Sequence, residues 1–209
     1  MRQRIQIRRR FAGRARLLAL CTAGLVVPTG AWTIYTEQLA LQPESKLWVE
    51  GTSTVKSFSC QASEVTATVD ASGTNAVARL MTGEKAVQAV SVVVASEKLD
   101  CGNGTMNEHM RKALKTAEAP TIAFRVTSYE LAKEANGVRG TLTGTLALGG
   151  ATKTITVPAT GTVSEGALHV TGAYPLAMSD YQLKAPSLMF GRIKVRDTVT
   201  VKFDLRLKS

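Results

Sequence analysis

The side chains best suited to acid–base chemistry in this 209-residue chain are its two histidines, His109 and His169. Glu108 precedes His109, but adjacent residues on a helix do not face each other, so they do not form an acid–base pair. His169 alternates with Leu168 and Val170, which places it on the solvent side of a strand. The sequence contains no nucleophile-elbow, zinc-protease or phosphate-loop pattern. We therefore expect no catalytic residue. An enzyme is less favoured than either a binding protein or a scaffold, the two other hypotheses considered below.

Two cysteines, Cys60 and Cys101, follow the N-terminal region. An even pair in an exported domain is most simply a disulfide, and two buried thiols are the alternative. A metal site that combines this pair with His109 lacks the usual ligand spacing, so no metal is expected.

Three cations, Arg192, Lys194 and Arg196, alternate along one predicted strand. The simpler interpretation is that these cations form a strand face exposed to solvent, with no ligand. The sharper one is a cationic rim that binds a diphosphate head group. Lys153 would join such a rim only if the fold brings it near. We keep Lys153, Arg192 and Lys194 as candidate head-group ligands.

Much of the net charge of +10 lies at the N-terminus, where seven arginines occur in the first 16 residues. The rest holds 19 basic and 16 acidic residues, a balance that does not imply a nucleic-acid partner. The apolar run that follows predicts a secretory signal over residues 1–31, cleaved after Ala31 or, as a second candidate, Ala40. An uncleaved anchor is the alternative. We expect a linker over residues 32–44, a domain over residues 45–209, membrane contact only through the leader, and a periplasmic or secreted location.

Alternating apolar residues predict strand after strand from residue 46 onward. The last run is the clearest, with one apolar face made of Val199, Val201, Phe203, Leu205 and Leu207. Asn136-Gly137 is a strong hairpin-turn signal, and Gly144 is expected to allow a bend. Eight or nine short strands predict an antiparallel sandwich or closed barrel.

Residues 105–115 break this alternation and predict a short amphipathic helix. Thr105 and Glu108 have the spacing of a capping box. One face of the helix is apolar and holds Met106, Met110, Ala113 and Leu114. Such a helix is expected to cover an open end of a barrel.

A loop with Leu188, Met189 and Phe190 in succession should not stay exposed, so it either plugs a core or lines a cavity. Aromatic residues make up only 5% of the chain, and strands rich in valine and alanine leave room inside. A barrel of about eight strands can be filled by side chains or hold one ligand. We rank the cavity ahead of the filled core.

Three stretches together resemble the YceI-like family of exported, lipocalin-like proteins. Residues 45–55 are similar to the family's opening motif S-x-x-x-x-x-G-T-S-x-V. Residues 106–110 and 119–124 are similar to its helix and the P-x-I-x-F strand that follows. Residues 175–191 are similar to the segment before its closing strand. Lys56-Ser57-Phe58 stands where many members have His-Asp-Trp. Phe58 keeps an apolar aromatic residue, but the polar character of the turn is changed, so a head-group contact is not carried over to it.

The resemblance implies an all-β fold, an antiparallel eight-stranded lipocalin-like barrel with one short amphipathic helix covering an end. It also implies an elongated apolar cavity that holds a polyisoprenoid chain, and it does not imply an enzyme. We expect no cofactor and no enzymatic activity. The expected ligand-binding residues are apolar: Val49, Phe58, Val92, Met106, Met110, Leu114, Phe124, Leu142, Leu146, Leu176, Met178, Leu188, Met189, Phe190, Val201 and Phe203. The expected partner is a long-chain isoprenoid lipid, and a homodimer is left open. The alternative is a cell-envelope scaffold or stress-related partner-binding module with a filled barrel.

Overall fold

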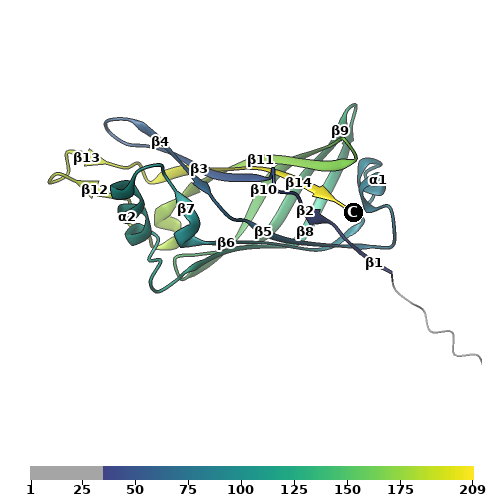
Figure 1. Cartoon of the computed structure of the whole chain (residues 1–209), viewed down its shortest axis with the longest axis horizontal. Coiled ribbons are helices and arrows are strands. Elements are labelled where there is room, and N and C mark those ends of the chain that lie inside the picture. Colours follow the sequence, from purple (N-terminus) through teal and green to yellow (C-terminus); the bar gives the residue numbers. More distant parts are fainter. Residues whose placement is uncertain (1–34) are drawn as a thin grey trace, which may run out of the picture. The chain divides into compact units, whose positions relative to one another are not determined.

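The computed structural model describes residues 35–209, so the signal predicted over residues 1–31 lies outside the described residues. Figure 1 shows the arrangement of the strands and helices. The strands are β1 Thr36–Gln38, β2 Ala40–Leu41, β3 Lys46–Thr52, β4 Ser57–Ala62, β5 Thr66–Ser72, β6 Val87–Ala95, β7 Leu99–Asp100, β8 Thr121–Glu134, β9 Gly137–Leu148, β10 Ala151–Ser164, β11 Ala167–Ala177, β12 Ser187–Leu188, β13 Ile193–Lys194 and β14 Thr198–Lys208. The helices are α1 Ala76–Met81, α2 Gly104–Ala113 and the 3-10 turns Ser96–Lys98 and Met178–Tyr181. None of the helices in this part of the chain is long and apolar enough to cross a membrane.

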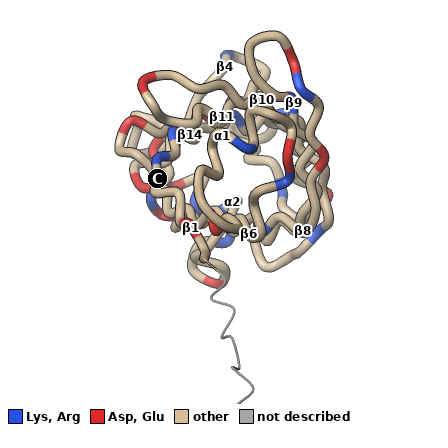
Figure 2. Tube along the Cα trace, turned by 90° about the vertical axis from the view of Figure 1, so that its right-hand side faces the viewer, with Lys and Arg blue, Asp and Glu red and all other residues tan. Residues whose placement is uncertain are grey.

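Eight strands of seven or more residues form the barrel wall, in the order β5-β6-β8-β9-β10-β11-β14-β3. Every neighbouring pair is antiparallel. Figure 2 looks along the barrel and shows these strands arranged in a ring. The predicted antiparallel, lipocalin-like fold is therefore confirmed. The strand count differs, because the sheet also contains the short strands β1, β2, β4 and β7, and β12 and β13 form a separate hairpin.

A seam between β3 and β5 is bridged by these short strands. β1 pairs with β5, and β2 pairs with β14, so residues 36–41 cross the seam at one end. Leu39, between β1 and β2, is only 2% exposed. At the other end, β7 follows β6 and pairs with β4. Residues 36–41 therefore belong to the barrel, which corrects the linker predicted over residues 32–44.

The wall alternates between an apolar inner face and a polar outer face. On β14 the inner residues are the five predicted from the sequence, and all of them line the interior cavity described below. On the outer face, Lys202 pairs with Glu50 at 2.8 Å. His169 of β11 pairs with Asp204 of β14 on the outer face, as its alternation with apolar neighbours predicts. Its position argues for a surface role.

The bend expected at Gly144 is present as a bulge. The β8–β9 pairing shifts register between Val126 and Ser128, opposite Gly144. A Cβ atom on Gly144 would lie less than 3.0 Å from the carbonyl group of Arg125. Only glycine therefore allows this close approach, which increases the local twist of the wall.

α1 closes one end of the barrel over a buried apolar cluster that includes Leu39, Val69 and Leu80. Its first backbone N–H, from Ala76, donates to the carboxylate of Glu37 at 2.9 Å. Because no side chain at the start of α1 caps it, Glu37 of β1 serves as its cap.

α2 lies at the opposite end of the barrel (Figure 1). Its cap is Asn103, whose side-chain oxygen accepts from the backbone N–H of Met106 at 3.0 Å. The capping box predicted for Thr105 and Glu108 is therefore wrong, because the helix begins at Gly104 and Thr105 already lies inside it. Asparagine satisfies the free N–H groups of the first turn as well as threonine does.

Candidate functional site

The barrel encloses an apolar cavity of about 400 Å³. The lining extends from Leu80 of α1 to Met110 of α2, at the opposite end. Of the described residues, no Asp, Glu, Lys or Arg lines it. The lining residues that carry a polar side-chain group are His109, Tyr129 and Tyr174. Such a lining suits an apolar ligand and offers little for the binding or turnover of a charged one.

Most of the apolar residues singled out in the sequence meet around this cavity. The ones that line it are Val49, Phe58, Val92, Met106, Met110, Leu114, Phe124, Leu142, Leu146, Leu176, Met178, Leu188, Val201 and Phe203. They come from β3, β4, β6, α2, β8, β9, β11, β12 and β14, and from the turn after β11. Alternation along each strand brings them to one inner face.

Met189 and Phe190 do not line the cavity, which corrects the expectation that their loop would be covered. Their exposures are 65% and 111%. Both have a positive φ, 51° and 56°, at the turn between β12 and β13. This turn leaves Leu188 in the cavity wall, while the next two side chains project into solvent.

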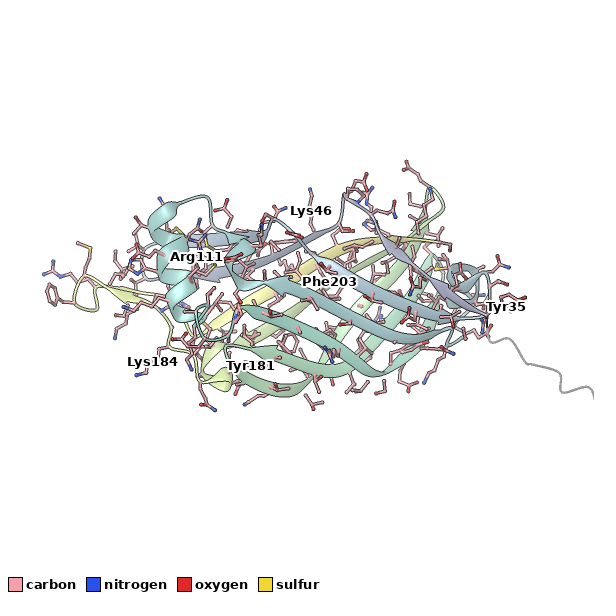
Figure 3. All side chains as sticks on the ribbon, turned by 60° about the horizontal axis from the view of Figure 1, so that its bottom comes forward. Tyr35, Lys46, Arg111, Tyr181, Lys184 and Phe203 are labelled. Atoms are coloured by element: carbon pink, nitrogen blue, oxygen red, sulfur yellow. A yellow bond between two sulfur atoms is a disulfide. The ribbon has the colours of Figure 1, made fainter. Side chains whose placement is uncertain are left out.

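Two aromatic rings lie against glycines of neighbouring strands. Phe58 is opposite Gly51, and Phe203 is opposite Gly172. A Cβ atom on either glycine would lie less than 3.0 Å from ring atoms of its partner. Phe203 is about midway along the barrel (Figure 3). The missing side chains therefore give each ring room against the wall, which keeps it from occupying the centre of the cavity.

His109 and the residues at the α1 end of the cavity are absent from the ligand-binding residues expected from the sequence. The side chain of His109, on α2, lines the cavity. Its spacing of three from Met106 and four from Ala113 is the signal that would have found it. The lining at the α1 end includes Leu80, Val138 and Leu168, which only the tertiary fold brings together.

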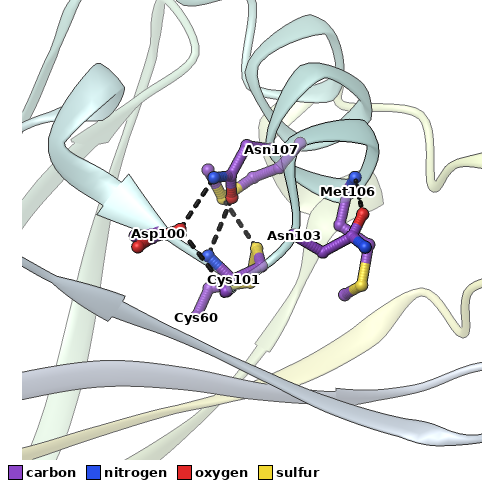
Figure 4. Close-up of a disulfide and its surroundings, with 8 residues drawn as sticks. Cys60, Asp100, Cys101, Asn103, Met106 and Asn107 are labelled. Atoms are coloured by element: carbon purple, nitrogen blue, oxygen red, sulfur yellow. Dashed lines mark hydrogen bonds between the residues drawn. A yellow bond between two sulfur atoms is a disulfide. The ribbon is translucent and has the colours of Figure 1, made fainter.

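The disulfide between Cys60 and Cys101 is confirmed, and it ties the start of α2 to β4. Asn107 accepts from the backbone N–H of Cys101 at 2.8 Å and donates to Asp100 at 2.7 Å (Figure 4). Hydrogen bonds from Asn107 and from the backbone of Gly102 lower the pKa of Asp100. No residue of α2 is fully buried. The helix is therefore a cover held firmly at its N-terminal end and packed lightly elsewhere.

Burial raises the pKa of two tyrosines, the half-buried Tyr129 and the fully buried Tyr181. The hydroxyl of Tyr129 accepts from the N–H of Val87 and donates to its carbonyl oxygen. Tyr181 is 2% exposed and packs beside Leu176 and Leu183. Burial, with smaller effects from Tyr174 and Asp180, raises the pKa of Tyr181 to about 12. The phenol therefore stays neutral at physiological pH.

The three candidate head-group cations do not line the cavity. Lys153 on β10 pairs with Asp180 at 3.3 Å. Arg192 and Lys194 are exposed on the hairpin that contains β12 and β13. A role for these side chains in binding a head group stays a prediction.

Comparison with known proteins adds a family and a fold. A family model described as "YceI-like domain" matches residues 37–207. Among solved structures, BcnA of Burkholderia cenocepacia is 20% identical, with a TM-score of 0.64 over 80% of this chain and 99% of that one. A polyisoprenoid binding domain from Saccharophagus degradans is 15% identical, with a TM-score of 0.54 over 85% and 99%. The YceI protein of Campylobacter jejuni is 17% identical, with a TM-score of 0.51 over 68% and 80%. No curated protein matches.

Proposed function

The chain belongs to the YceI-like domain family, and on that premise we propose that it holds a long apolar lipid of the polyisoprenoid class in its barrel and catalyses no reaction. The observation that carries the proposal is the cavity of about 400 Å³ with no charged side chain in its lining. A related solved domain is described as polyisoprenoid binding, which supports the same class of ligand.

The free energy of binding would come from burial of the lipid chain. Each methylene removed from water contributes about 0.8 kcal/mol, so even part of a long chain would bind well in a preformed cavity. With only His109, Tyr129 and Tyr174 to offer polar contacts, selectivity would depend mainly on the length and shape of the chain.

We further propose that residues 1–31 direct export and that the domain works in the periplasm or outside the cell. The disulfide between Cys60 and Cys101 supports this location, because such bonds persist mainly in oxidising compartments.

The scaffold alternative predicted a barrel filled by its own side chains. A cavity of about 400 Å³ is the opposite of that prediction, so we favour the lipid carrier.

The test begins with native mass spectrometry and organic extraction of the full-length protein purified from its own host. A co-purified isoprenoid lipid is expected. Binding of a fluorescent isoprenoid analogue is then compared in two variants. Val92→Trp adds bulk on the inner face of β6, and Ser91→Trp adds the same bulk on its outer face as a control.

Val92→Trp should weaken analogue binding by about ten-fold or more, which corresponds to about 1.4 kcal/mol. Ser91→Trp should leave it unchanged. The proposal fails if no lipid co-purifies and the wild-type protein does not bind the analogue. It also fails if both variants bind the analogue as the wild type does.

A further inference from the structure

The barrel end that bears α2 also presents unusually exposed apolar side chains. Five large apolar residues are exposed among residues 35–209, and three of them belong to two turns at this end. Met189 and Phe190 form the tip of the β12–β13 hairpin, and Val55, 68% exposed, lies in the turn between β3 and β4. We call these three residues the apolar tip.

The two turns are held together as one surface. The backbone N–H of Thr54 donates to the carbonyl oxygen of Lys194 at 2.9 Å. The hydroxyl of Thr54 donates to the carbonyl oxygen of Arg192 at 3.0 Å. Ser53 and Val195 form a further β-bridge. Figure 1 shows both turns projecting beyond the barrel at the α2 end. The members of the apolar tip therefore come from two segments that support each other.

Five exposed cations lie in these two turns or in the residues that flank the β12–β13 hairpin, and we call them the cationic collar: Lys56, Lys184, Arg192, Lys194 and Arg196. Residues 53–58 and 184–196 contain no acidic residue. None of the five forms an ion pair with another described residue. Lys184 lies at the α2 end, away from Tyr35 at the other (Figure 3).

The collar accounts for the positive charge of the whole domain. The described residues hold 19 Lys and Arg and 16 Asp and Glu. Without the five collar residues, 14 cations face 16 anions, so the rest of the domain is slightly negative. The five collar residues are therefore a local concentration of positive charge in a domain that is otherwise close to neutral.

We propose that the apolar tip and the cationic collar dock this end of the barrel onto an anionic membrane surface. Exposed Phe and Met side chains partition into the boundary between head groups and acyl chains, and nearby Lys and Arg are attracted to anionic lipids. Charge complementarity favours such a surface. A fluid interface also suits side chains that project from a turn, because it needs no matching groove.

Docking would bring the cavity to the membrane. Leu188, directly before Met189, lines the cavity, and so do Pro186 and Val195 of the same hairpin. The members of the apolar tip do not line it. Docking therefore does not depend on which ligand the barrel holds, and it adds a second membrane contact to the one expected from the leader.

The first test uses a tryptophan reporter in the full-length chain, read against the wild-type background of Trp32 and Trp48. Phe190→Trp places the reporter at the tip. Val163→Trp is the matched control, since Val163 is 45% exposed beside the β10–β11 turn. Each variant is mixed with phosphatidylglycerol vesicles, phosphatidylcholine vesicles, or phosphatidylglycerol vesicles containing brominated lipid.

The emission of Phe190→Trp should shift to shorter wavelength with phosphatidylglycerol and be quenched by the brominated lipid. Phosphatidylcholine should have little effect, and Val163→Trp should not respond. An unshifted Phe190→Trp signal overturns the proposal, and so does an equal response from both positions. The leader is the same in both chains and cannot produce the difference.

The second test removes charge from the collar. In the Phe190→Trp background, Lys56→Gln with Arg196→Gln should weaken the vesicle response by about 25-fold, about five-fold for each cation. Lys133→Gln with Lys208→Gln, two exposed cations outside the collar, is the control and should have a much smaller effect. Equal losses in the two pairs overturn the proposal.

The isoprenoid analogue keeps the two proposals separate. A collar variant that loses the vesicle response but still binds the analogue supports the docking surface and shows that the barrel is intact. A chain that docks on vesicles yet does not bind the analogue contradicts the proposed ligand and leaves the docking surface standing.

Discussion

Gly51→Ala is the substitution that most directly tests how the cavity is kept open. The added Cβ atom would lie less than 3.0 Å from three ring atoms of Phe58, whereas ordinary contact begins at 3.4 Å. All three of its nearest neighbours belong to that ring, so the ring must move while the backbone can stay. Both residues are on the inner wall, so the ring is displaced toward the cavity. Overpacking of this kind costs about 1–3 kcal/mol.

The assay is a double-mutant cycle followed by urea unfolding. Gly51→Ala alone should lower the free energy of unfolding by about 1–3 kcal/mol. In the Phe58→Leu background the same change should cost much less, with a coupling of about 1 kcal/mol or more. Binding of the isoprenoid analogue should weaken in Gly51→Ala and recover in the double variant.

Gly172→Ala provides the matched comparison. Its Cβ atom would meet the ring of Phe203 and also the carbonyl oxygen of Pro158, at 2.6 Å. Since the carbonyl belongs to the neighbouring strand, Phe203→Leu should rescue Gly172→Ala only in part. The reasoning is refuted if Gly51→Ala costs less than about 0.5 kcal/mol, or if it costs the same with and without the Phe58 ring.

Three further predictions concern stability. Replacing Cys60 and Cys101 by serine removes the disulfide that closes a loop of 41 residues and should lower the free energy of unfolding by about 4 kcal/mol, measured by urea unfolding against the oxidised wild type; an unchanged midpoint would contradict it. Because the pKa of Tyr181 is raised to about 12 from 10.0, stability should fall as the pH rises above 10, by about 1 kcal/mol more at pH 11 than in Tyr181→Phe; parallel pH profiles would argue against this. A hydrogen bond with Ser209 and, second, the one from the backbone N–H of Ala76 lower the pKa of Glu37, so the stability that its carboxylate contributes is present above the ordinary carboxyl pKa of 4.5 and is lost as the pH falls through the lowered value; Glu37→Gln should speed amide exchange in α1 at pH 7, and unchanged exchange would show that the cap is dispensable.

The inner wall could be predicted because a strand has a period of two. Once Val92, Leu142 and Val201 are recognised as members of apolar runs, their neighbours at even spacing must share their face. The structure places all three in the cavity lining. No knowledge of the strand order was needed for this result.

Other features depend on geometry that short segments do not encode. β1 and β2 have three and two residues, too few to show a period, and exist as strands because β5 and β14 are beside them. The exposure of Phe190 depends on the positive φ values at the hairpin turn. For α2, both Asn103 and Thr105 are good caps, and the choice of Asn103 follows from where the helix begins.

The pairing of β2 with β14 determines which strands of the domain can pair early in folding and which must pair last. Leu41 lies opposite Leu207, so residues near the beginning of the barrel pair with residues near the end of its last strand. β3 also pairs with β14, and β11 completes its other edge. During synthesis, which starts at the N-terminus, β5, β6, β8, β9 and β10 can pair with one another first. The ring of strands cannot close until β14, near the C-terminus, has been made. Closure therefore joins residues far apart in sequence, the kind of contact that makes barrels fold slowly and leaves their apolar inner faces open until the last step.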